Sequence, residues 1–243
     1  MKIDSETKRK LRDMKAVDLL EALEDESPLS YDITAEERLR VAVDVAYSRY
    51  INRRINGLIS TAKLRYPEAD VHLIEFIDGR GLSKAQIAEY ATCEYINEGN
   101  NIIIEGFAGT GKTYLACALT KEACKRQIST RYVRLPDLKE EWEKAKLKPN
   151  GVRNLKRRYG RYSLLVVDEW MLEPITDEFR NLVLEIFELR YKRCSTILCT
   201  QAKVEDWHAK LGGDTTAESI IDRIVHNTSK IKLQGINMRK RLG

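Results

Sequence analysis

The chain has 243 residues, of which 43% are hydrophobic and 33% are charged, and its formal net charge is +5. This length allows one sizeable α/β domain with a smaller accessory region and is too short for two large domains. The apolar runs are far shorter than a bilayer span, and MKIDSETKRKLRDMK has charges where a secretory signal needs apolar residues. We therefore expect a cytoplasmic protein with no membrane segment. An odd number of cysteines without a CxxC pair favours buried, reduced thiols over a zinc site.

Residues 1–68 are predicted to form a helical domain. Thr34 and Glu37 have the spacing of a capping box, and the segment that follows, to about residue 65, has no proline and has apolar residues at helical spacing. Pro67 is expected to end this helix. The predicted inner face consists of Leu39, Val43, Ala46, Tyr50, Ile51, Ile55, Leu58, Ile59 and Ala62. The other face is rich in arginine, including Arg53 and Arg54, and forms either a solvated surface or a contact with DNA.

Residues 69–243 are predicted to form an α/β domain. A connection leads to a helix over about 83–97, after which short apolar runs alternate with helical segments. Five such runs favour a five-stranded parallel sheet with helices on both faces. The runs are residues 101–105, 130–134, 163–167, 195–200 and 229–233.

The strongest motif is GFAGTGKT, which follows the first predicted strand and precedes a helical segment. This is the G-x-x-x-x-G-K-[ST] pattern of a P-loop, in which backbone amides converge on phosphate groups at the start of a helix. Lys112 is expected to reach the β- and γ-phosphates, and the Thr113 hydroxyl is expected to coordinate Mg²⁺. The predicted nucleotide-binding residues are Gly106, Phe107, Ala108, Gly109, Thr110, Gly111, Lys112, Thr113 and Tyr114.

Two further strand ends carry polar residues. The run Leu164–Val167 is followed by Asp168 and Glu169, so we expect Asp168 to hold Mg²⁺ and Glu169 to activate the attacking water. Thr200 and Gln201 end the fourth predicted strand. If this strand lies between the P-loop strand and the Asp168 strand, these side chains are placed to orient the water; otherwise they are ordinary polar residues at a strand exit.

The interval from Lys144 to Arg161 is rich in lysine and arginine and contains no acidic residue. It is either a solvated loop or a surface that contacts DNA phosphates without reading sequence. The predicted DNA contacts are Lys146, Lys148, Arg153, Lys156, Arg157 and Arg158, together with Arg53 and Arg54. Arg223 lies on a helix before the last strand, where a lone arginine is usually solvent-exposed.

With these residues in view, the chain resembles the IstB-like family of AAA+ ATPases, helper proteins of a class of bacterial transposons that are related to the DnaC helicase loaders. The resemblance covers nearly the whole chain. Its most specific parts are RYKRCSTILCTQ and the stretch from VEDWHAKLGGD to ESIIDRIVHNTSKIKLQGINMRK.

The resemblance implies an ATPase that uses ATP and Mg²⁺. It implies a protein that forms a ring or spiral on double-stranded DNA, bends that DNA and delivers it to an IstA-like transposase. It also implies that Lys112 and Glu169 are catalytic, that Thr200 and Gln201 form a sensor, and that Arg223 is an arginine finger for the next subunit.

Two departures from the family pattern are visible. Trp170 and Met171 stand where relatives commonly have Leu-Gly, and the chain after Arg223 is too short for the helical lid of most AAA+ proteins. We therefore expect no lid or a minimal one, with Arg239 as a candidate second sensor. A DnaC-like helicase loader is the main alternative. A small-molecule kinase and a nucleotide-binding scaffold without turnover are further ones.

Overall fold

The computed structural model describes residues 3–25, 34–235, 237 and 238. It divides into two compact units, Met1–Gly57 and Leu58–Gly243. The two units meet after Gly57, before the predicted boundary at residue 68. Residues Leu58, Ile59, Ala62 and Leu64 pack against the core of the second unit, so this stretch belongs to it.

The first unit is helical, with α1 (Ser5–Asp13), α2 (Val17–Glu24) and most of α3 (Ala35–Ala62). The capping box that begins α3 is present, because Thr34 N donates to Glu37 Oε2 (2.9 Å) and Glu37 N donates to Thr34 Oγ1 (3.2 Å). The helix ends at Ala62, slightly before the predicted limit, because Lys63 adopts a left-handed φ of +54°.

The predicted inner face of α3 is wrong over its first half. Leu39, Val43 and Tyr50 are 52%, 46% and 50% exposed. Two short helices supply too little apolar surface to cover such a long helix, and α2 is joined to it through the ion pairs Arg49–Glu21 and Arg53–Asp18. The prediction holds for Leu58, Ile59 and Ala62, which lie in the second unit.

The second unit is built on a five-stranded parallel sheet of order β2-β3-β4-β1-β5. The strands are β1 (Asn101–Gly106), β2 (Thr130–Arg134), β3 (Leu164–Trp170), β4 (Ser195–Thr200) and β5 (Thr228–Leu233). All five were predicted, with small differences in their bounds. The P-loop strand β1 and the Asp168 strand β3 flank β4, as expected for a sensor strand.

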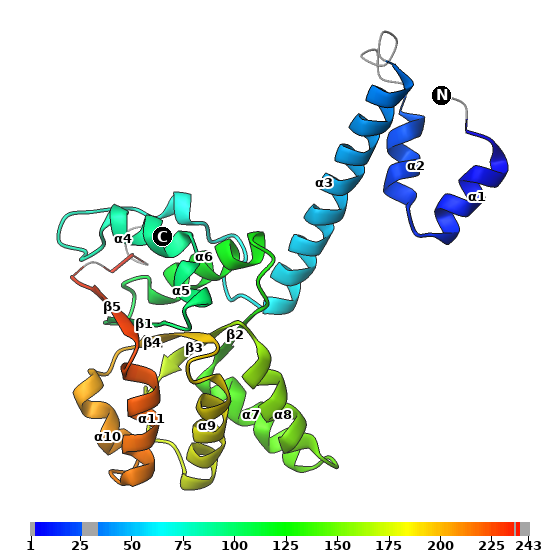
Figure 1. Ribbon diagram of the computed structural model, residues 1–243. Helices are drawn as coiled ribbons and strands as arrows, with labels where there is room; N and C mark the ends of the chain where they lie inside the picture. The colour runs from blue at the N-terminus through cyan, green and yellow to red at the C-terminus, as the bar shows by residue number, and fades with distance from the viewer. Residues whose placement is uncertain (1–2, 26–33, 236, 239–243) are drawn as a thin grey trace. The chain divides into compact units, whose positions relative to one another are not determined.

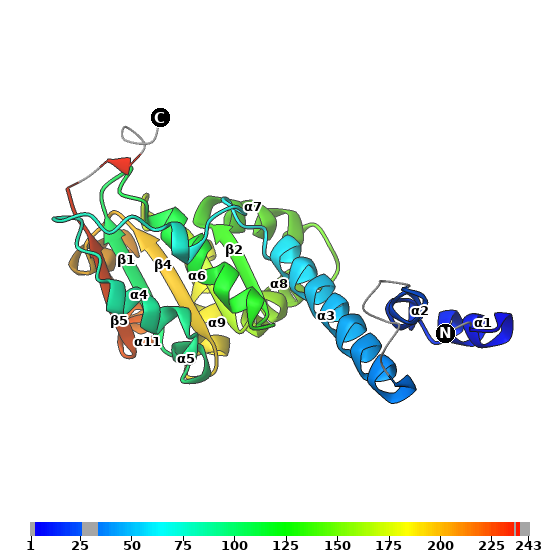
Figure 2. The same cartoon turned by 90° about the horizontal axis from the view of Figure 1, so that it is seen from above.

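Helices cover both faces of the sheet (Figure 1). One layer contains α4 (Lys84–Ala91), α5 (Glu94–Asn97) and α6 (Lys112–Lys125), and the short η2 (Val71–Leu73) precedes them in the chain. Figure 2 shows these three helices in front of the strands. The other contains α7 (Leu135–Lys146), α8 (Gly151–Arg161), α9 (Asp177–Arg190), η3 (Val204–Asp206), α10 (Trp207–Lys210) and α11 (Thr215–Val225). Each layer encloses its own apolar core because strand side chains alternate between the two faces.

Two predicted segments differ in detail. The single helix expected over 83–97 is interrupted, because Cys93 has a left-handed φ of +66° and separates α4 from α5. The basic interval expected as a loop forms mainly the helix α8. After β5 the described residues end at Met238, whose N–H donates to Gly109 O (2.8 Å), so no helical lid is present in the described part of the chain.

Candidate nucleotide site

The P-loop backbone adopts a shape that requires glycine. Gly109 and Gly111 have left-handed φ values of +82° and +94°. A Cβ atom on Gly106 would lie 2.7 Å from the Leu233 carbonyl oxygen. The loop leads from the buried strand β1 directly into α6, whose first residues are Lys112 and Thr113. Backbone N–H groups and the positive end of the helix dipole therefore face the loop, which is the arrangement that binds phosphate.

Lys112 and Thr113 are both engaged at this edge of the sheet. The Lys112 ammonium donates to the carbonyl oxygens of Gly106 (2.7 Å) and Phe107 (2.8 Å). Thr113 Oγ1 donates to Asp168 Oδ2 (2.7 Å), so the two predicted metal ligands are in direct contact. A hydroxyl and a carboxylate, with room for phosphate oxygens and water, fit the oxygen coordination that Mg²⁺ prefers.

Asp168 is almost fully buried and is held by several donors. Tyr132 Oη donates to Asp168 Oδ2 (2.8 Å), and the backbone N–H of Glu169 donates to Oδ1 (2.8 Å). Burial, with the neighbouring Asp168 charge, raises the pKa of the Tyr132 phenol well above its ordinary value, so it remains a hydrogen-bond donor. Tyr132 was not predicted as a site residue, because its place beside Asp168 depends on the pairing of β2 with β3.

Glu169 lies where β3 leaves the regular sheet. Its φ is +57°, and the register between β3 and β4 shifts between Val167 and Trp170. Its Oε1 atom lies 3.4 Å from Arg65 Nη1 and 3.8 Å from Arg134 Nη1. Neither arginine was predicted as a site residue. Arg65 follows α3, and Arg134 ends β2, where the parallel register brings it opposite Asp168.

A cavity of about 580 Å³ opens beside these residues, which is a suitable size for a nucleotide. Ala108, Gly109, Gly111, Lys112, Thr113 and Tyr114 line it on the P-loop side. Tyr66, Leu73, Ile74 and Met238 add an apolar wall that suits a base. Among the predicted nucleotide-binding residues, Phe107 is 78% exposed and Thr110 is buried, and Gly106, Phe107 and Thr110 do not line the cavity.

Arg80 holds the P-loop from the segment before β1. Its Nη1 donates to Glu75 O (2.6 Å) and its Nη2 to Thr110 O (3.4 Å), and burial lowers its pKa. The Arg80 carbonyl in turn accepts from Gln234 N (2.9 Å), beyond β5. Arg80 was not predicted as a site residue, although the pattern Gly-Arg-Gly at 79–81 marks its position in the sequence.

The structure separates the two predicted sensor residues. The Thr200 hydroxyl accepts from Ala202 N (3.0 Å) and donates to Ala202 O (3.1 Å), so it is used in the turn after β4. Gln201 is exposed and lines the cavity with Asp168 and Glu169. Of the pair, Gln201 is therefore the one whose side chain faces the cavity.

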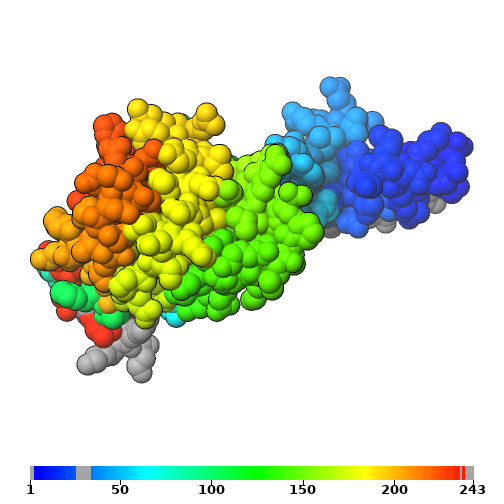
Figure 3. Space-filling view, turned by 90° about the horizontal axis from the view of Figure 1, so that it is seen from below, coloured from blue at the N-terminus to red at the C-terminus, as the bar shows by residue number. Residues whose placement is uncertain are grey.

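Arg223 does not join these residues within the subunit. It lies on α11, where its Nη1 donates to Ser219 O (2.7 Å) and its Nη2 pairs with Glu188 of α9. In Figure 3, α9 lies between α8 and α11 on the helical face below the sheet. Arg223 is not among the residues that line the nucleotide cavity. Arg239, the candidate second sensor, lies outside the described residues.

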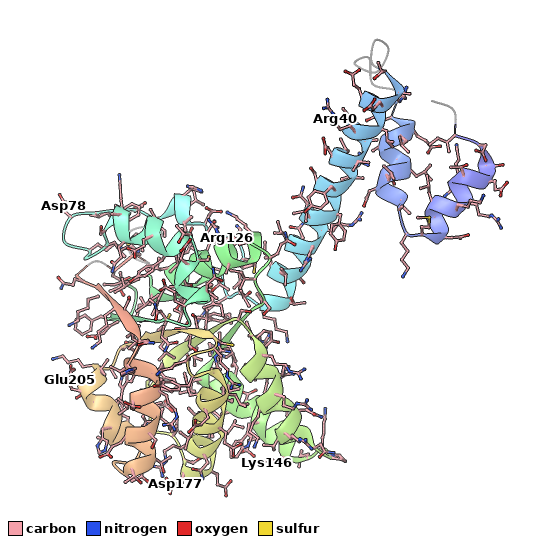
Figure 4. All side chains as sticks on the ribbon, viewed as in Figure 1. Arg40, Asp78, Arg126, Lys146, Asp177 and Glu205 are labelled. Carbon is pink, nitrogen blue, oxygen red and sulfur yellow. The ribbon has the colours of Figure 1, made fainter. Side chains whose placement is uncertain are left out.

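The predicted DNA contacts fall into paired and unpaired residues. Lys146 pairs with Glu143 (2.7 Å), Lys156 with Glu185, and Arg158 with Glu141, so acids that lie outside the basic interval offset part of its charge. Figure 4 shows Lys146 at the carboxyl end of α7, on the face of the sheet opposite α6. Lys148, Arg153 and Arg157 are exposed and form no ion pair with the described residues. In the first unit, Arg53 pairs with Asp18, whereas Arg54 is exposed.

The remaining expectations concern cysteines and membrane segments. Cys93, Cys117, Cys124 and Cys199 are buried and Cys194 is half-buried, all as free thiols. Burial raises the pKa of Cys93 and of Cys117 to about 11. Among the described residues, none of the helices combines the length and apolar character needed to cross a bilayer.

Comparison with known proteins agrees with the geometry. The family model described as IstB-like ATP binding protein matches residues 9–242. A putative insertion sequence ATP-binding protein of Sinorhizobium fredii is 35% identical over 87% of this chain and 85% of its own length. Another, from Pseudomonas fluorescens, is 31% identical over 72% of this chain and 75% of its own.

Solved structures share the fold at low identity. The DnaC helicase loader superposes with a TM-score of 0.57 at 21% identity, covering 70% of this chain and 99% of that one. DnaI gives a TM-score of 0.58 at 21% identity, covering 72% and 92%. At this identity the likeness shows a shared fold and carries no further assignment.

Proposed function

Because the chain belongs to the family of IstB-like ATP-binding proteins, we propose that it hydrolyses ATP with Mg²⁺, assembles on duplex DNA and delivers that DNA to a transposase. One observation carries the proposal of hydrolysis. The P-loop lysine, the Thr113–Asp168 pair and the Glu169 carboxylate lie at one edge of the sheet and line a single cavity. The insertion-sequence context of the relatives supports the role in transposition.

The proposed chemistry assigns one task to each residue. The P-loop amides and Lys112 bind the phosphates, and Thr113 with Asp168 would hold Mg²⁺, which offsets phosphate charge when it is bound. Glu169 accepts a proton from the attacking water, and Gln201 orients that water. Thr200 supports Gln201 through the turn that its hydroxyl forms.

We assign the arginine finger to Arg223 and propose that it acts on the nucleotide of a neighbouring subunit. Its position on α11, outside its own nucleotide cavity, supports an action in trans. ATP bound by Lys112 of one subunit and by Arg223 of the next stabilises a ring or spiral by mass action, and hydrolysis removes that link.

Assembly is tested by sedimentation of the full-length protein with Glu169→Gln, which blocks turnover, in the presence of ATP. Duplex and single-stranded DNA of equal length are compared. We expect a large ATP-dependent assembly on duplex that disappears when Arg223→Ala is added and is retained with Lys230→Ala, which removes an exposed cation from β5. A preference for the single strand would favour a helicase loader instead, and a monomer indifferent to DNA would contradict the proposal.

For the DNA surface, we propose that the exposed residues Lys148, Arg153 and Arg157 bind most of the phosphates. Changing all three to glutamine should lower the slope of log affinity against log salt by about 0.9 for each phosphate that is no longer neutralised. The matched control changes Lys146, Lys156 and Arg158, whose acidic partners already offset their charge. An equal weakening by both triple variants would contradict this assignment.

Delivery of the DNA is tested separately. An immobilised IstA-like transposase is incubated with labelled duplex, this protein and ATP, and the retained label is measured. We expect retention that requires both this protein and ATP. Equal retention by the transposase alone would contradict a delivery role.

A further inference from the structure

The Asp168 carboxylate is held on both of its oxygens. Oδ2 accepts from Thr113 Oγ1 (2.7 Å) and from Tyr132 Oη (2.8 Å), whereas Oδ1 accepts from the backbone N–H of Glu169 (2.8 Å). An ionised carboxylate has about four lone-pair sites, two on each oxygen. Among the contacts of the described residues, both sites on Oδ2 are therefore filled, and Oδ1 keeps one.

The Thr113 hydroxyl has a defined orientation for the same reason. Its proton is directed to Asp168 Oδ2, so its own lone pairs remain for a cation in the cavity that Thr113 and Asp168 both line. The two predicted metal ligands thus offer few oxygen lone pairs, at positions that the hydrogen bonds set.

Tyr132 reaches Asp168 from the neighbouring strand. In the parallel register of β2 and β3 it lies opposite Val166, two residues before Asp168, so all three side chains are on the face of the sheet that α6 covers. Two residues along a strand span about 6.5 Å, so only a long side chain covers this offset. Tyr132 is 5% exposed and Asp168 is 3% exposed, so solvent has little access to their hydrogen bond.

Mg²⁺ and Ca²⁺ place different demands on such a carboxylate. Mg²⁺ needs a nearly ideal octahedron with oxygens at about 2.0–2.1 Å, whereas Ca²⁺ takes about six to eight oxygens at about 2.3–2.6 Å and often binds a carboxylate through both oxygens. Selection between them depends on the number of ligands and on their freedom to move. A carboxylate with one free lone pair cannot bind a cation through both oxygens.

We propose that Tyr132 is a positioning residue that makes the metal site select Mg²⁺ over Ca²⁺. By filling the second site on Oδ2, the Tyr132 hydroxyl leaves Asp168 with a single free lone pair and prevents the carboxylate from turning both oxygens toward a larger cation. The inference rests on the proposed function, in which Thr113 and Asp168 hold Mg²⁺.

The test measures how much each metal strengthens nucleotide binding by the full-length protein. The affinity for a fluorescent, non-hydrolysable ATP analogue is determined with Mg²⁺, with Ca²⁺ and with neither metal. In the wild type, we expect the gain from Mg²⁺ to exceed the gain from Ca²⁺ by about tenfold or more. In Tyr132→Phe, we expect the gain from Mg²⁺ to fall by about tenfold, at the lower end of the range for partners of metal ligands. Its affinity with Ca²⁺ and without metal should change by less than about threefold.

Tyr159→Phe is the matched control. It also removes a buried phenol hydroxyl that donates to a carboxylate, Glu141 Oε2 (2.9 Å), but neither Tyr159 nor Glu141 lines the nucleotide cavity. We expect this variant to keep the wild-type gains from both metals. Metal-free affinity close to that of the wild type also shows that each variant is folded.

Several results would overturn the inference while leaving the proposed function intact. Equal gains from the two metals in the wild type would do so without any variant. In Tyr132→Phe, an unchanged gain from Mg²⁺ would mean that the hydroxyl has no role in selection, and equal losses with both metals or a loss of metal-free binding would mean that it only maintains the site. A wild type that gains no affinity from either metal would instead overturn the proposed Mg²⁺ site, and the inference with it.

Discussion

Replacement of Arg190 by lysine should be strongly destabilising, although it keeps the charge. Arg190 ends α9 and is 1% exposed, and no carboxylate neutralises it among the described residues. Its Nε donates to Thr196 Oγ1 (3.1 Å), its Nη1 to the carbonyl oxygens of Tyr159 (2.8 Å) and Tyr162 (2.7 Å), and its Nη2 to Ser195 O. Burial lowers its pKa to about 10, so it stays charged at neutral pH.

The expected size follows from these hydrogen bonds. A lysine ammonium lacks the planar fork and cannot reach acceptors on both sides of the guanidinium, so we expect it to keep about half of the hydrogen bonds. Loss of about two bonds to a charged donor, at about 1.5–3 kcal/mol each, gives roughly 3–6 kcal/mol. With a urea m-value of about 2 kcal/mol/M, this lowers the unfolding midpoint by roughly 1.5–3 M.

Urea unfolding followed by circular dichroism measures this difference. Arg193→Lys is the matched control, because Arg193 is exposed and forms no ion pair with the described residues, and we expect it to change stability by less than about 0.5 kcal/mol. An Arg190→Lys variant as stable as the control would refute the reasoning, since it would mean that a single point charge replaces the whole hydrogen-bond network.

Three further changes have defined outcomes. Met171→Gly removes a fully buried side chain, which costs about 2–5 kcal/mol of stability. It also relieves a left-handed φ of +53°, which returns about 1–2 kcal/mol. Urea unfolding should therefore show a net loss of stability, and a gain would contradict this balance. Tyr132→Phe removes the hydroxyl that donates to Asp168, so the free energy of unfolding should fall by about 1.5–3 kcal/mol, and an unchanged value would show that the bond is dispensable. Cys117 has a pKa raised from 9.0 to about 11 in the folded protein, so its stabilising contribution is complete below pH 9 and is lost as pH rises to 11. Cys117→Ala should therefore flatten the alkaline loss of stability, by up to about 3 kcal/mol at pH 11 in urea unfolding, and an unchanged pH profile would count against the burial argument.

The parts of the fold that could be predicted from the sequence are those with a strong local pattern. The five strands follow short apolar runs, and the P-loop follows its own motif, so β1, β3 and the start of α6 were placed correctly. The order β2-β3-β4-β1-β5 puts β4 beside both β1 and β3, as the sensor prediction required.

The errors arise where tertiary contacts decide the outcome. The face of α3 predicted to be inward is exposed at Leu39, Val43 and Tyr50, because periodicity shows which residues share a face and not whether anything covers it. The basic interval had no acid of its own, but the fold brings Glu141 and Glu185 against it. Arg65, Arg80 and Tyr132 lie far from the motifs in sequence, so only the fold brings them to the site.

Met171 shows how one backbone shape can be kept with a different side chain. The family resemblance implies glycine at this position, and the left-handed φ of +53° is the conformation that glycine adopts most readily. Here the methionine side chain is fully buried in the core between the sheet and α9. The burial offsets the conformational cost, so the departure from the family pattern leaves Asp168 and Glu169 in place.

The position of β1 in the sheet also determines when the site can form during synthesis. Both neighbours of β1, the strands β4 and β5, come later in the chain, and the P-loop is held by Arg80 before it and by Met238 after it. A ribosome-bound chain that ends before β4 has a complete P-loop motif but no strand to support it. Such long-range pairing slows folding. The ability to bind nucleotide should therefore appear late, only after Met238 has left the ribosome.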